Sequence, residues 1–247
     1  MPNSVSDPAA DIQPASPANA SYQIVSQHDD FVVIDKAPEV HFHSQDGHAG
    51  VVAQVEQDLN CKLYSVHRLD TPTSGLIILA KSSAVAAKFT ELFSQHLVQK
   101  YYLAIAEGKP RKKQGWVIGD MAKSRRSMYK LLRSQENPAI TQFFSQSIAE
   151  GVRLYLLKPH SGKTHQLRVA LASIGVPIAG DKLYGKADSQ HQRCYLHAYT
   201  LVFEYLGQQY QFQSLPKIGS LFIDKACMQQ LQTEWASPDA LVWPKRK

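Results

Sequence analysis

The feature that most constrains the fold is a succession of short strand-like segments, several of which flank tight turns. The segments paired in this way are Tyr22–Ser26 with Phe31–Lys36, Ala139–Ile148 with Val152–Lys158, and Tyr199–Tyr205 with Gln209–Gln213. Strands that are joined by short turns pair antiparallel. Two further strands are predicted at Leu76–Ala80, whose apolar run is continuous as in a buried strand, and at Lys100–Glu107.

Only a few segments have helical spacing. Val51–Leu59 predicts a short helix, and Ser82 or Ser83 can cap a second one that runs to about Val98. Apolar residues at 167, 170, 171 and 174 predict a third helix, and Ile218–Trp235 predicts a closing amphipathic helix. These elements together predict an α+β domain, in which helices flank a mainly antiparallel mixed sheet.

Composition and hydropathy set the domain boundaries. Residues 1–20 are rich in proline and small polar residues, which predicts a disordered leader, and residues 241–247 predict a frayed basic tail. The domain would span residues 21–240. The 247-residue chain has neither an apolar run long enough for a transmembrane helix nor a signal peptide, so we expect a cytoplasmic protein that is a monomer.

Basic residues are concentrated in one stretch of a chain whose formal net charge is +6. Ten of them lie between positions 100 and 133, opposed only by Glu107 and Asp120, and aromatic residues are interleaved with them. Cations neutralise phosphates and aromatic rings stack on bases, so this stretch favours binding to RNA or DNA. The alternative is a solvated basic region that binds nothing.

A polar turn leads directly into the predicted buried strand, with the sequence His67-Arg68-Leu69-Asp70-Thr71-Pro72-Thr73-Ser74-Gly75-Leu76. Charged residues at such a position suit the floor of a cleft, where Asp70 would act as a nucleophile or a base. Thr73 and Ser74 could hydrogen-bond the turn and hold the carboxylate, and Gly75 permits close backbone approach. The alternative is a capped turn with a surface pair of Arg68 and Asp70.

A second cationic motif, Gly162-Lys163-Thr164-His165-Gln166-Leu167-Arg168, follows a predicted strand and opens the third helix. It lacks the upstream glycine of a phosphate-binding P-loop, because Leu157 stands there. What remains is a cationic helix start, in which Lys163, His165 and Arg168 are close and Arg168 could bind a carboxylate or phosphate bidentately. The alternative is a solvated helix cap.

Tyrosines and histidines mark two further candidate sites. In the strand that begins at Lys100, side chains alternate faces, so Lys100, Tyr102 and Ala104 share one face and would suit a polar pocket; the alternative is two ordinary strand tyrosines. Histidines at 41, 43 and 48 could bind a metal, but no cysteine or acidic partner has ligand spacing, so we interpret them as a polar loop.

Together these three motifs resemble the RluA-like family of RNA pseudouridine synthases. The first matches the family's catalytic motif H-R-L-D-x-x-T-S-G-L without a mismatch, and the others resemble its K-x-Y-x-A and G-R-T-H-Q-[IL]-R motifs in the expected order. Gly180-Asp181-x-x-Tyr184 and Leu196-His197-Ala198 match further family landmarks. The resemblance extends from about Ser21 to Ser214 and implies the pseudouridine synthase fold.

The resemblance implies the roles of individual residues. Asp70 would be the catalytic aspartate, Tyr102 the active-site tyrosine, and Arg168 the partner of Asp70. Leu196 would line the uracil pocket, and Arg68 would fill the stack that the flipped base vacates. Lys163 and His165 would contact substrate. The implied reaction isomerises a uridine in ribosomal or transfer RNA without gaining atoms, so no cofactor or metal is expected.

Two positions depart from the family pattern. Lys163 stands where arginine is common, and Ala170 where many members have histidine. Only about 20 poorly patterned residues precede the domain, so we expect no S4-type RNA-binding domain and assign RNA contacts to the catalytic domain. Two alternatives remain open, namely a catalytically inactive RNA-binding module and a nucleotide-dependent enzyme that uses Gly162-Lys163-Thr164.

Overall fold

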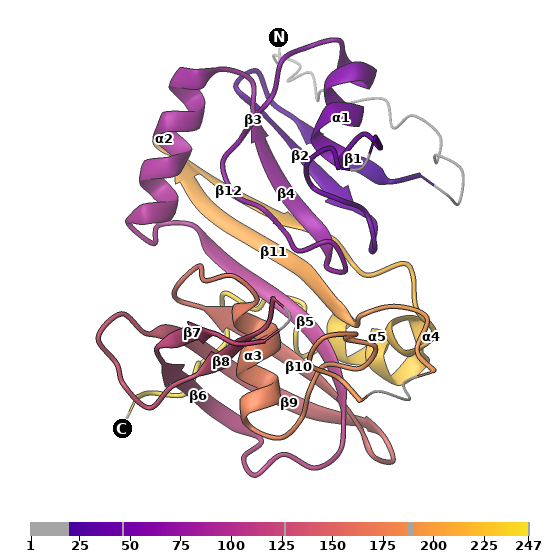
Figure 1. Ribbon diagram of the computed structural model, residues 1–247. Helices are drawn as coiled ribbons and strands as arrows, with labels where there is room; N and C mark the ends of the chain where they lie inside the picture. The colour runs from indigo at the N-terminus through magenta and orange to yellow at the C-terminus, as the bar shows by residue number, and fades with distance from the viewer. Residues whose placement is uncertain (1–19, 46, 126, 187–189, 247) are drawn as a thin grey trace, which may run out of the picture.

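A single large, twisted sheet runs through the molecule in the computed structural model, which describes residues 20–45, 47–125, 127–186 and 190–246 (Figure 1). Its strand order is β1-β2-β4-β11-β5-β10-β9-β6, with β3 paired to β4 and β12 to β11. Its strands are β1 (Tyr22–Gln27), β2 (Phe31–Lys36), β3 (Tyr64–Ser65), β4 (Ser74–Ala80), β5 (Gln99–Glu107), β6 (Gln114–Gly119), β9 (Ala139–Ala149), β10 (Val152–Pro159), β11 (Leu196–Tyr205) and β12 (Gln208–Gln213). A separate hairpin consists of β7 (Met121–Lys123) and β8 (Tyr129–Leu131).

Pairing within the sheet is almost entirely antiparallel. In the described residues only β11 and β4 pair parallel, through His197 with Ser74 and Ala198 with Gly75. A Cβ atom on Gly75 would lie 2.2 Å from the Ala198 carbonyl oxygen, so only glycine fits there. The predicted α+β class with a mainly antiparallel mixed sheet is therefore confirmed.

Helices cover both faces of the upper part of the sheet in Figure 1. On β2 and β4 successive side chains point to opposite faces, and all of them except Asp35 are buried. Helix α2 (Ser83–Ser94) packs through Phe89 on the face that carries Val33 and Ile78, whereas α1 (Val51–Leu59) packs on the face that carries Val32. Burial on both faces explains the uninterrupted apolar run at Leu76–Ala80.

The lower part of the sheet has α3 (Gln166–Ser173) on one face and α4 (Ser220–Ile223) with α5 (Lys225–Gln232) at one side (Figure 1). The prediction of one continuous helix over Ile218–Trp235 is wrong. Asp224 has extended backbone angles and its side chain accepts a hydrogen bond from the Ala226 N–H, so it ends α4 and caps α5. The second predicted helix also ends earlier, at Ser94, because the backbone of His96 is left-handed.

The structure describes less of the N-terminal end of the chain than of the C-terminal end. Residues 1–19 of the predicted disordered leader lie outside the described residues. Within the predicted basic tail of residues 241–247, Trp243 packs on Phe144 with 4.8 Å between ring centroids, and the Pro244 carbonyl accepts two side-chain hydrogen bonds. No helix in the described part is long and apolar enough to cross a membrane.

Candidate active site

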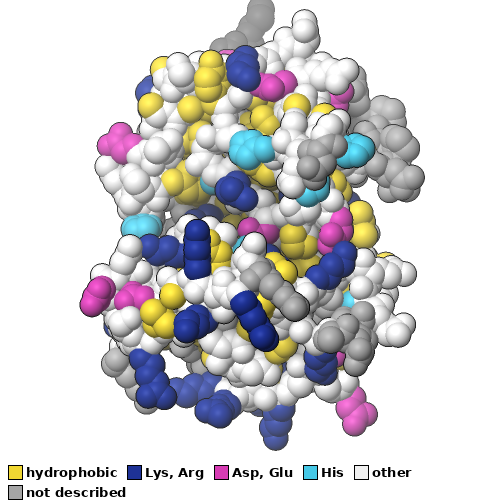
Figure 2. Space-filling model, in the orientation of Figure 1, with side chains coloured by type: hydrophobic (Ala, Val, Ile, Leu, Met, Phe, Trp, Pro, Cys, Tyr) yellow, Lys and Arg dark blue, Asp and Glu magenta, His cyan; other side chains and the backbone are white. Residues whose placement is uncertain are grey.

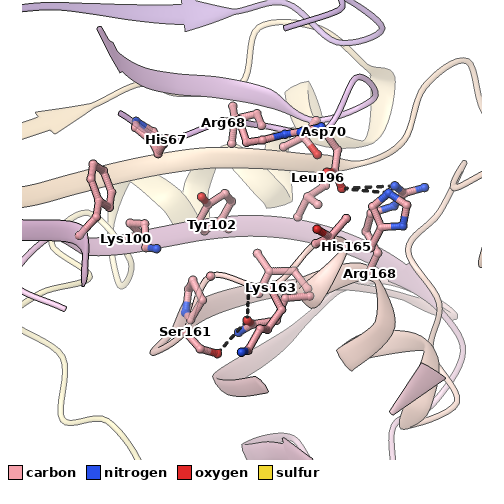
Figure 3. A pocket seen from close by; sticks show the side chains of 18 of the residues that line it. His67, Arg68, Asp70, Lys100, Tyr102, Ser161, Lys163, His165, Arg168 and Leu196 are labelled. Atoms are coloured by element: carbon pink, nitrogen blue, oxygen red, sulfur yellow. Dashed lines mark hydrogen bonds and ion pairs between the residues drawn. The ribbon is translucent and has the colours of Figure 1, made fainter. Parts of the chain in front are cut away.

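A cleft of about 430 Å³ lies between the upper and lower parts of the sheet. It is lined by residues 66–70 of the turn before β4, by residues 93–102 around the start of β5, by the 159–168 segment that leads into α3, and by Leu196 of β11. Lysine and arginine side chains gather around this hollow and over the lower half of the same face (Figure 2). Figure 3 shows that all seven predicted site residues are in or beside this cleft.

Asp70 sits on the turn between β3 and β4, with its side chain 20% exposed toward the cleft. The turn is closed by a hydrogen bond from the Thr73 N–H to the Asp70 carbonyl at 3.0 Å, and the neighbouring Leu69 is buried. The sequence-derived placement of this carboxylate on a cleft floor, directly before a buried strand, therefore agrees with the structure. Two groups approach the carboxylate from the segment around the start of α3, namely Arg168 and His165 (Figure 3).

Arg168 contacts Asp70, but its stronger partner is Asp181. One Nη atom of Arg168 donates to Asp70 Oδ2 at 3.3 Å, while Nε and the other Nη donate to the two Asp181 oxygens at 2.7 Å each. Burial alone would lower the pKa of Arg168, but the hydrogen bonds and charge of Asp181, with help from Asp70, raise it above its usual value. Arg168 is thus a fixed cation that bridges two carboxylates.

His165 approaches Asp70 from a strained backbone position. Its φ of 56° is left-handed, and its Nε2 lies 3.9 Å from Asp70 Oδ2. Its Nδ1 lies 2.9 Å from the Tyr184 hydroxyl, which itself accepts a hydrogen bond from the Tyr129 N–H on β8. Burial lowers the pKa of His165, although the charge of Asp70 opposes this. The imidazole therefore stays neutral at lower pH than an ordinary histidine does.

Tyr102 and Leu196 belong to the apolar part of the cleft lining. Tyr102 on β5 points into the cleft between Lys100 and Asp70, and Leu196 lies between Tyr102 and Arg168 (Figure 3). Burial, followed by the charge of Asp70, raises the pKa of Tyr102 above its usual value, so its phenol is protonated at neutral pH. Among the described residues its hydroxyl has no hydrogen-bond partner, which leaves the ring and the hydroxyl free for a ligand.

Arg68 and Lys163 differ in what holds them. Arg68 is exposed at the edge of the cleft and makes no hydrogen bond or ion pair with the described residues. Lys163 Nζ donates to Asn137 Oδ1 at 2.7 Å, so its charge points away from Asp70. The hypothesis that Lys163, His165 and Arg168 gather at one point therefore holds for His165 and Arg168 but not for the Lys163 ammonium group.

Gln166 shapes the loop before α3, a role that sequence reasoning missed. Its Oε1 accepts from the Ser161 hydroxyl at 2.8 Å and from the Lys163 N–H at 3.0 Å. Its Nε2 donates to the carbonyl of Ile140 and to the hydroxyl of Thr141 on β9. One buried side chain thus ties the loop to the sheet and orients the first turn of α3, which carries Arg168.

A second polar cluster lies behind the turn that carries Asp70, on the side away from the Asp70 carboxylate. The Ser74 hydroxyl accepts from an Nη of Arg193 at 2.7 Å and lies 2.8 Å from His197 Nδ1, while His197 Nε2 faces the Ser214 carbonyl at 2.8 Å. A carbonyl requires a donor, so His197 carries its proton on Nε2 and accepts from Ser74. Ser74 therefore fixes the turn from behind, which corrects the hypothesis that it holds the Asp70 carboxylate.

Lys36 also fixes the turn that carries Asp70, again from behind. It is fully buried, and its Nζ donates to the carbonyls of Ala37, Val40 and Thr71 at 2.8 to 3.1 Å. Burial, followed by the charge of Arg193, lowers its pKa to about 7. The contact with Thr71 connects the end of β2 to the residue that follows Asp70.

His67, the first residue of the motif, has a structural role. Its Nε2 accepts from the Ile78 N–H at 2.9 Å, and its ring packs on Phe93 with 4.7 Å between centroids. Burial, followed by the charge of Lys100, lowers its pKa to about 3, so it stays neutral. It therefore anchors the start of the turn against β4 at the end of the cleft that Lys100 lines.

The predicted basic stretch is divided between two places. Residues 109–113 lie in the connection from β5 to β6, whereas Lys123, Arg125 and Lys130 lie on the β7–β8 hairpin, and β8 contacts α3 beside the cleft. Arg126 lies outside the described residues. The three histidines at 41, 43 and 48 form no metal-binding group, since the described part of the chain contains no cluster of three suitable ligands.

Comparisons with known proteins identify relatives of this arrangement. Residues 30–173 match a family model described as RNA pseudouridylate synthase. An uncharacterized RNA pseudouridine synthase of Haemophilus influenzae is 45% identical over 217 residues, which cover 87% of this chain and 97% of that protein. A ribosomal large subunit pseudouridine synthase C of Rickettsia bellii is 38% identical over 143 residues, covering 56% of this chain and 48% of that protein.

A solved structure shares the fold. Human RNA pseudouridylate synthase domain containing 1 superimposes with a TM-score of 0.73 and 24% sequence identity, over 95% of this chain and 100% of that chain. At this level of identity the likeness concerns the fold alone. It supports the sheet order described above.

Proposed function

This chain belongs to the RNA pseudouridine synthase family, isomerases that act on uridine in RNA, and we propose that it isomerises a specific uridine of ribosomal or transfer RNA, with Asp70 as the catalytic residue. The name of the Rickettsia relative favours ribosomal RNA. The observation that carries the proposal is the convergence of Asp70, Arg168 and Tyr102 on one cleft.

The reaction breaks the bond between ribose C1′ and uracil N1 and rejoins the base through C5. A stacked uridine hides C1′, so the nucleotide is flipped into the cleft, at a cost of a few kcal/mol. Leu196 and the ring of Tyr102 supply apolar contacts that offset this cost. Arg68 is exposed at the edge without a partner among the described residues, which suits insertion of its guanidinium plane into the vacated stack.

Asp70 acts at the ribose, either by attack on carbon or by removal of the 2′ proton. Both routes use the Asp70 carboxylate, and Arg168 orients it through the hydrogen bond at 3.3 Å. Asp181 keeps Arg168 oriented, so Arg168 does not reorganise when the charge on Asp70 changes. The His165 Nε2 faces the same carboxylate oxygen at 3.9 Å, so it lies near Asp70 without a direct hydrogen bond to it.

Tyr102 stacks on the uracil in this proposal and accepts the C5 proton late in the reaction. Its protonated phenol is a poor base in the free enzyme, because burial and the charge of Asp70 raise its pKa. The phenol must therefore release its own proton to solvent before its oxygen can take the proton from C5.

We further propose that the enzyme works as a monomer in the cytoplasm, where ribosomal and transfer RNA are available. One chain supplies Asp70, Arg168, Tyr102 and the basic surroundings of the cleft, which supports the monomer. Lys163 contacts the loop that follows β8 and would meet RNA outside the target nucleotide rather than at Asp70.

Purified protein incubated with ribosomal or transfer RNA from cells that lack it tests the proposal. We expect pseudouridine to rise in one of the two RNA pools, as measured by nucleoside analysis. Asp70→Asn should abolish this rise while RNA affinity stays nearly intact, because the amide has almost the same shape as the carboxylate. RNA binding without pseudouridine formation by the wild-type protein would instead support the inactive RNA-binding module.

A further inference from the structure

The C-terminal segment crosses the lower sheet and ends close to the loops that border the cleft. Trp243 packs between Tyr101 and Phe144, with ring centroids at 5.8 and 4.8 Å, and Lys158 Nζ lies 5.6 Å from the Trp243 ring centroid. These contacts bury part of the indole, and its Nε1 donates to the Pro238 carbonyl at 2.9 Å. The segment is therefore anchored on the sheet before its last residues.

The next residue, Pro244, is held by two side-chain hydrogen bonds. The Pro244 carbonyl accepts from Trp116 Nε1 at 2.8 Å and from Gln142 Nε2 at 2.7 Å. Gln142 is 3% exposed, and its Oε1 lies 2.9 Å from Nε2 of His160, whose ring stacks on Trp116 at 5.2 Å between centroids. His160 directly precedes the loop that leads to α3, so the anchor point of the tail is adjacent to the catalytic segment.

The exposed end of the segment carries two cations. An Nη of Arg246 donates to Gln135 Oε1 at 3.2 Å, in the loop after β8. Two residues later in the same loop, Asn137 holds Lys163 Nζ at 2.7 Å. Neither Lys245 nor Arg246 has a carboxylate within ion-pair distance among the described residues, although Glu136 lies in this loop.

We propose, on the basis of the proposed function, that Lys245 and Arg246 bind the phosphate backbone of the substrate RNA outside the target nucleotide. Lysine and arginine without protein carboxylate partners retain their full charge for phosphates. The docking of Trp243 and Pro244 fixes where these cations lie, so less chain entropy is lost on binding than with a free tail. The segment extends the basic surface from Lys163 along one edge of the lower half.

Binding of large-subunit ribosomal RNA, freed of protein, tests this proposal at several salt concentrations. The double variant Lys245→Ala/Arg246→Ala should bind at least about five-fold more weakly, and its slope of log affinity against log salt should be smaller by about 1.5 to 2. A control, Lys81→Ala/Lys225→Ala, removes the same charge from side chains that make no hydrogen bond or ion pair with other described residues, and it should match the wild type. Equal salt slopes for the two double variants would overturn the proposal.

A second variant separates a docked tail from a free one. Trp116→Phe removes the N–H that binds the Pro244 carbonyl but keeps an aromatic ring beside His160. We expect weaker RNA binding, by about two- to three-fold, with an unchanged thermal unfolding midpoint. RNA affinity equal to that of the wild type would show that docking is irrelevant and would contradict this part of the proposal.

Activity measurements keep this inference distinct from the proposed function. At saturating RNA the double variant should form pseudouridine at the wild-type rate, with a raised KM. A wild-type protein that forms no pseudouridine in any RNA would refute the proposed function. Pseudouridine formation by the wild type, together with an unchanged KM in the double variant, would refute only the role of Lys245 and Arg246.

Discussion

The turn that carries Asp70 has polar groups on both sides, but the partners of the buried arginine differ between the two sides. On the cleft side Arg168 pairs with two carboxylates, Asp70 and Asp181. On the rear side Arg193 donates only to neutral oxygens, namely three backbone carbonyls and the Ser74 hydroxyl. Both guanidiniums are at most 4% exposed.

Their pKa values show what each arrangement achieves. Burial lowers the pKa of Arg193 to about 10, since no carboxylate among the described residues pairs with it directly, whereas Asp181 raises that of Arg168. The cleft side therefore holds opposite charges close together, ready to act on a substrate. The rear side holds the turn in place by hydrogen bonds to neutral groups, and we expect substitutions there to affect stability before chemistry.

The largest expected effect is on the cleft side, at Tyr102. Tyr102→Phe should reduce pseudouridine formation at least about 100-fold, because the reaction loses its proposed C5 base. Stability should hardly change, since the hydroxyl has no hydrogen-bond partner among the described residues. Single-turnover kinetics and a thermal unfolding curve measure both quantities. Full activity would reduce Tyr102 to a packing role.

Arg168 tests whether charge or structure matters on the cleft side. Arg168→Gln leaves the buried Asp181 unpaired, so we expect a loss of about 3 to 5 kcal/mol in the free energy of unfolding and at least about a 100-fold loss of activity. The double variant Arg168→Gln/Asp181→Asn removes both charges and should regain most of the stability but none of the activity. Activity that returns together with stability would show that Arg168 is only structural.

Arg193 should behave in the opposite way. Arg193→Gln leaves the Ser74 hydroxyl and the Leu196 carbonyl short of a donor, so we expect a loss of about 1 to 3 kcal/mol in stability. Activity at saturating RNA should fall only about ten-fold, through looser placement of the turn. A loss of activity as large as that in Arg168→Gln, with unchanged stability, would contradict the distinction between the two sides.

The smallest expected effect is a pH dependence from His197 on the rear side. Burial lowers its pKa in the folded state to about 4, compared with 6.5 for an ordinary histidine, so the unfolded chain binds the proton more tightly. Its contribution to stability is complete above pH 6.5 and is lost as the pH falls toward 4, at a rate on the order of 1 kcal/mol per pH unit. Denaturant unfolding of His197→Gln between pH 7 and 5 should show a shallower slope than the wild type. Identical slopes would mean that His197 does not cause this dependence.

Sequence reasoning predicted the cleft side well, because its residues lie in contiguous motifs. Asp70 precedes a buried strand, and Tyr102 follows the alternation of β5. Arg168 was expected to bind a carboxylate bidentately, and it does, but the bidentate partner is Asp181 rather than Asp70. The sequence could not rank these two partners, since Asp70 is 98 positions from Arg168 and Asp181 lies in the loop beyond the end of α3.

The rear side and the tail could not be predicted in the same way. Ser74 and Arg193 are 119 positions apart, and only the parallel pairing of β4 with β11 brings them together. Local polarity predicts a basic end after residue 240, but it gives no sign that Trp243 packs on the sheet against Phe144. The break at Asp224 had a local signal, because aspartate is a strong N-cap residue within an otherwise amphipathic stretch.

Pseudouridine mapping across ribosomal and transfer RNA in cells tests the central claim most directly. The comparison requires cells that lack this protein, the same cells given the wild-type chain, and the same cells given Asp70→Asn at equal protein level. We predict that at least one uridine loses its modification without the protein and regains it only with the wild-type chain. Restoration by Asp70→Asn, or an identical map in all three, would contradict the claim.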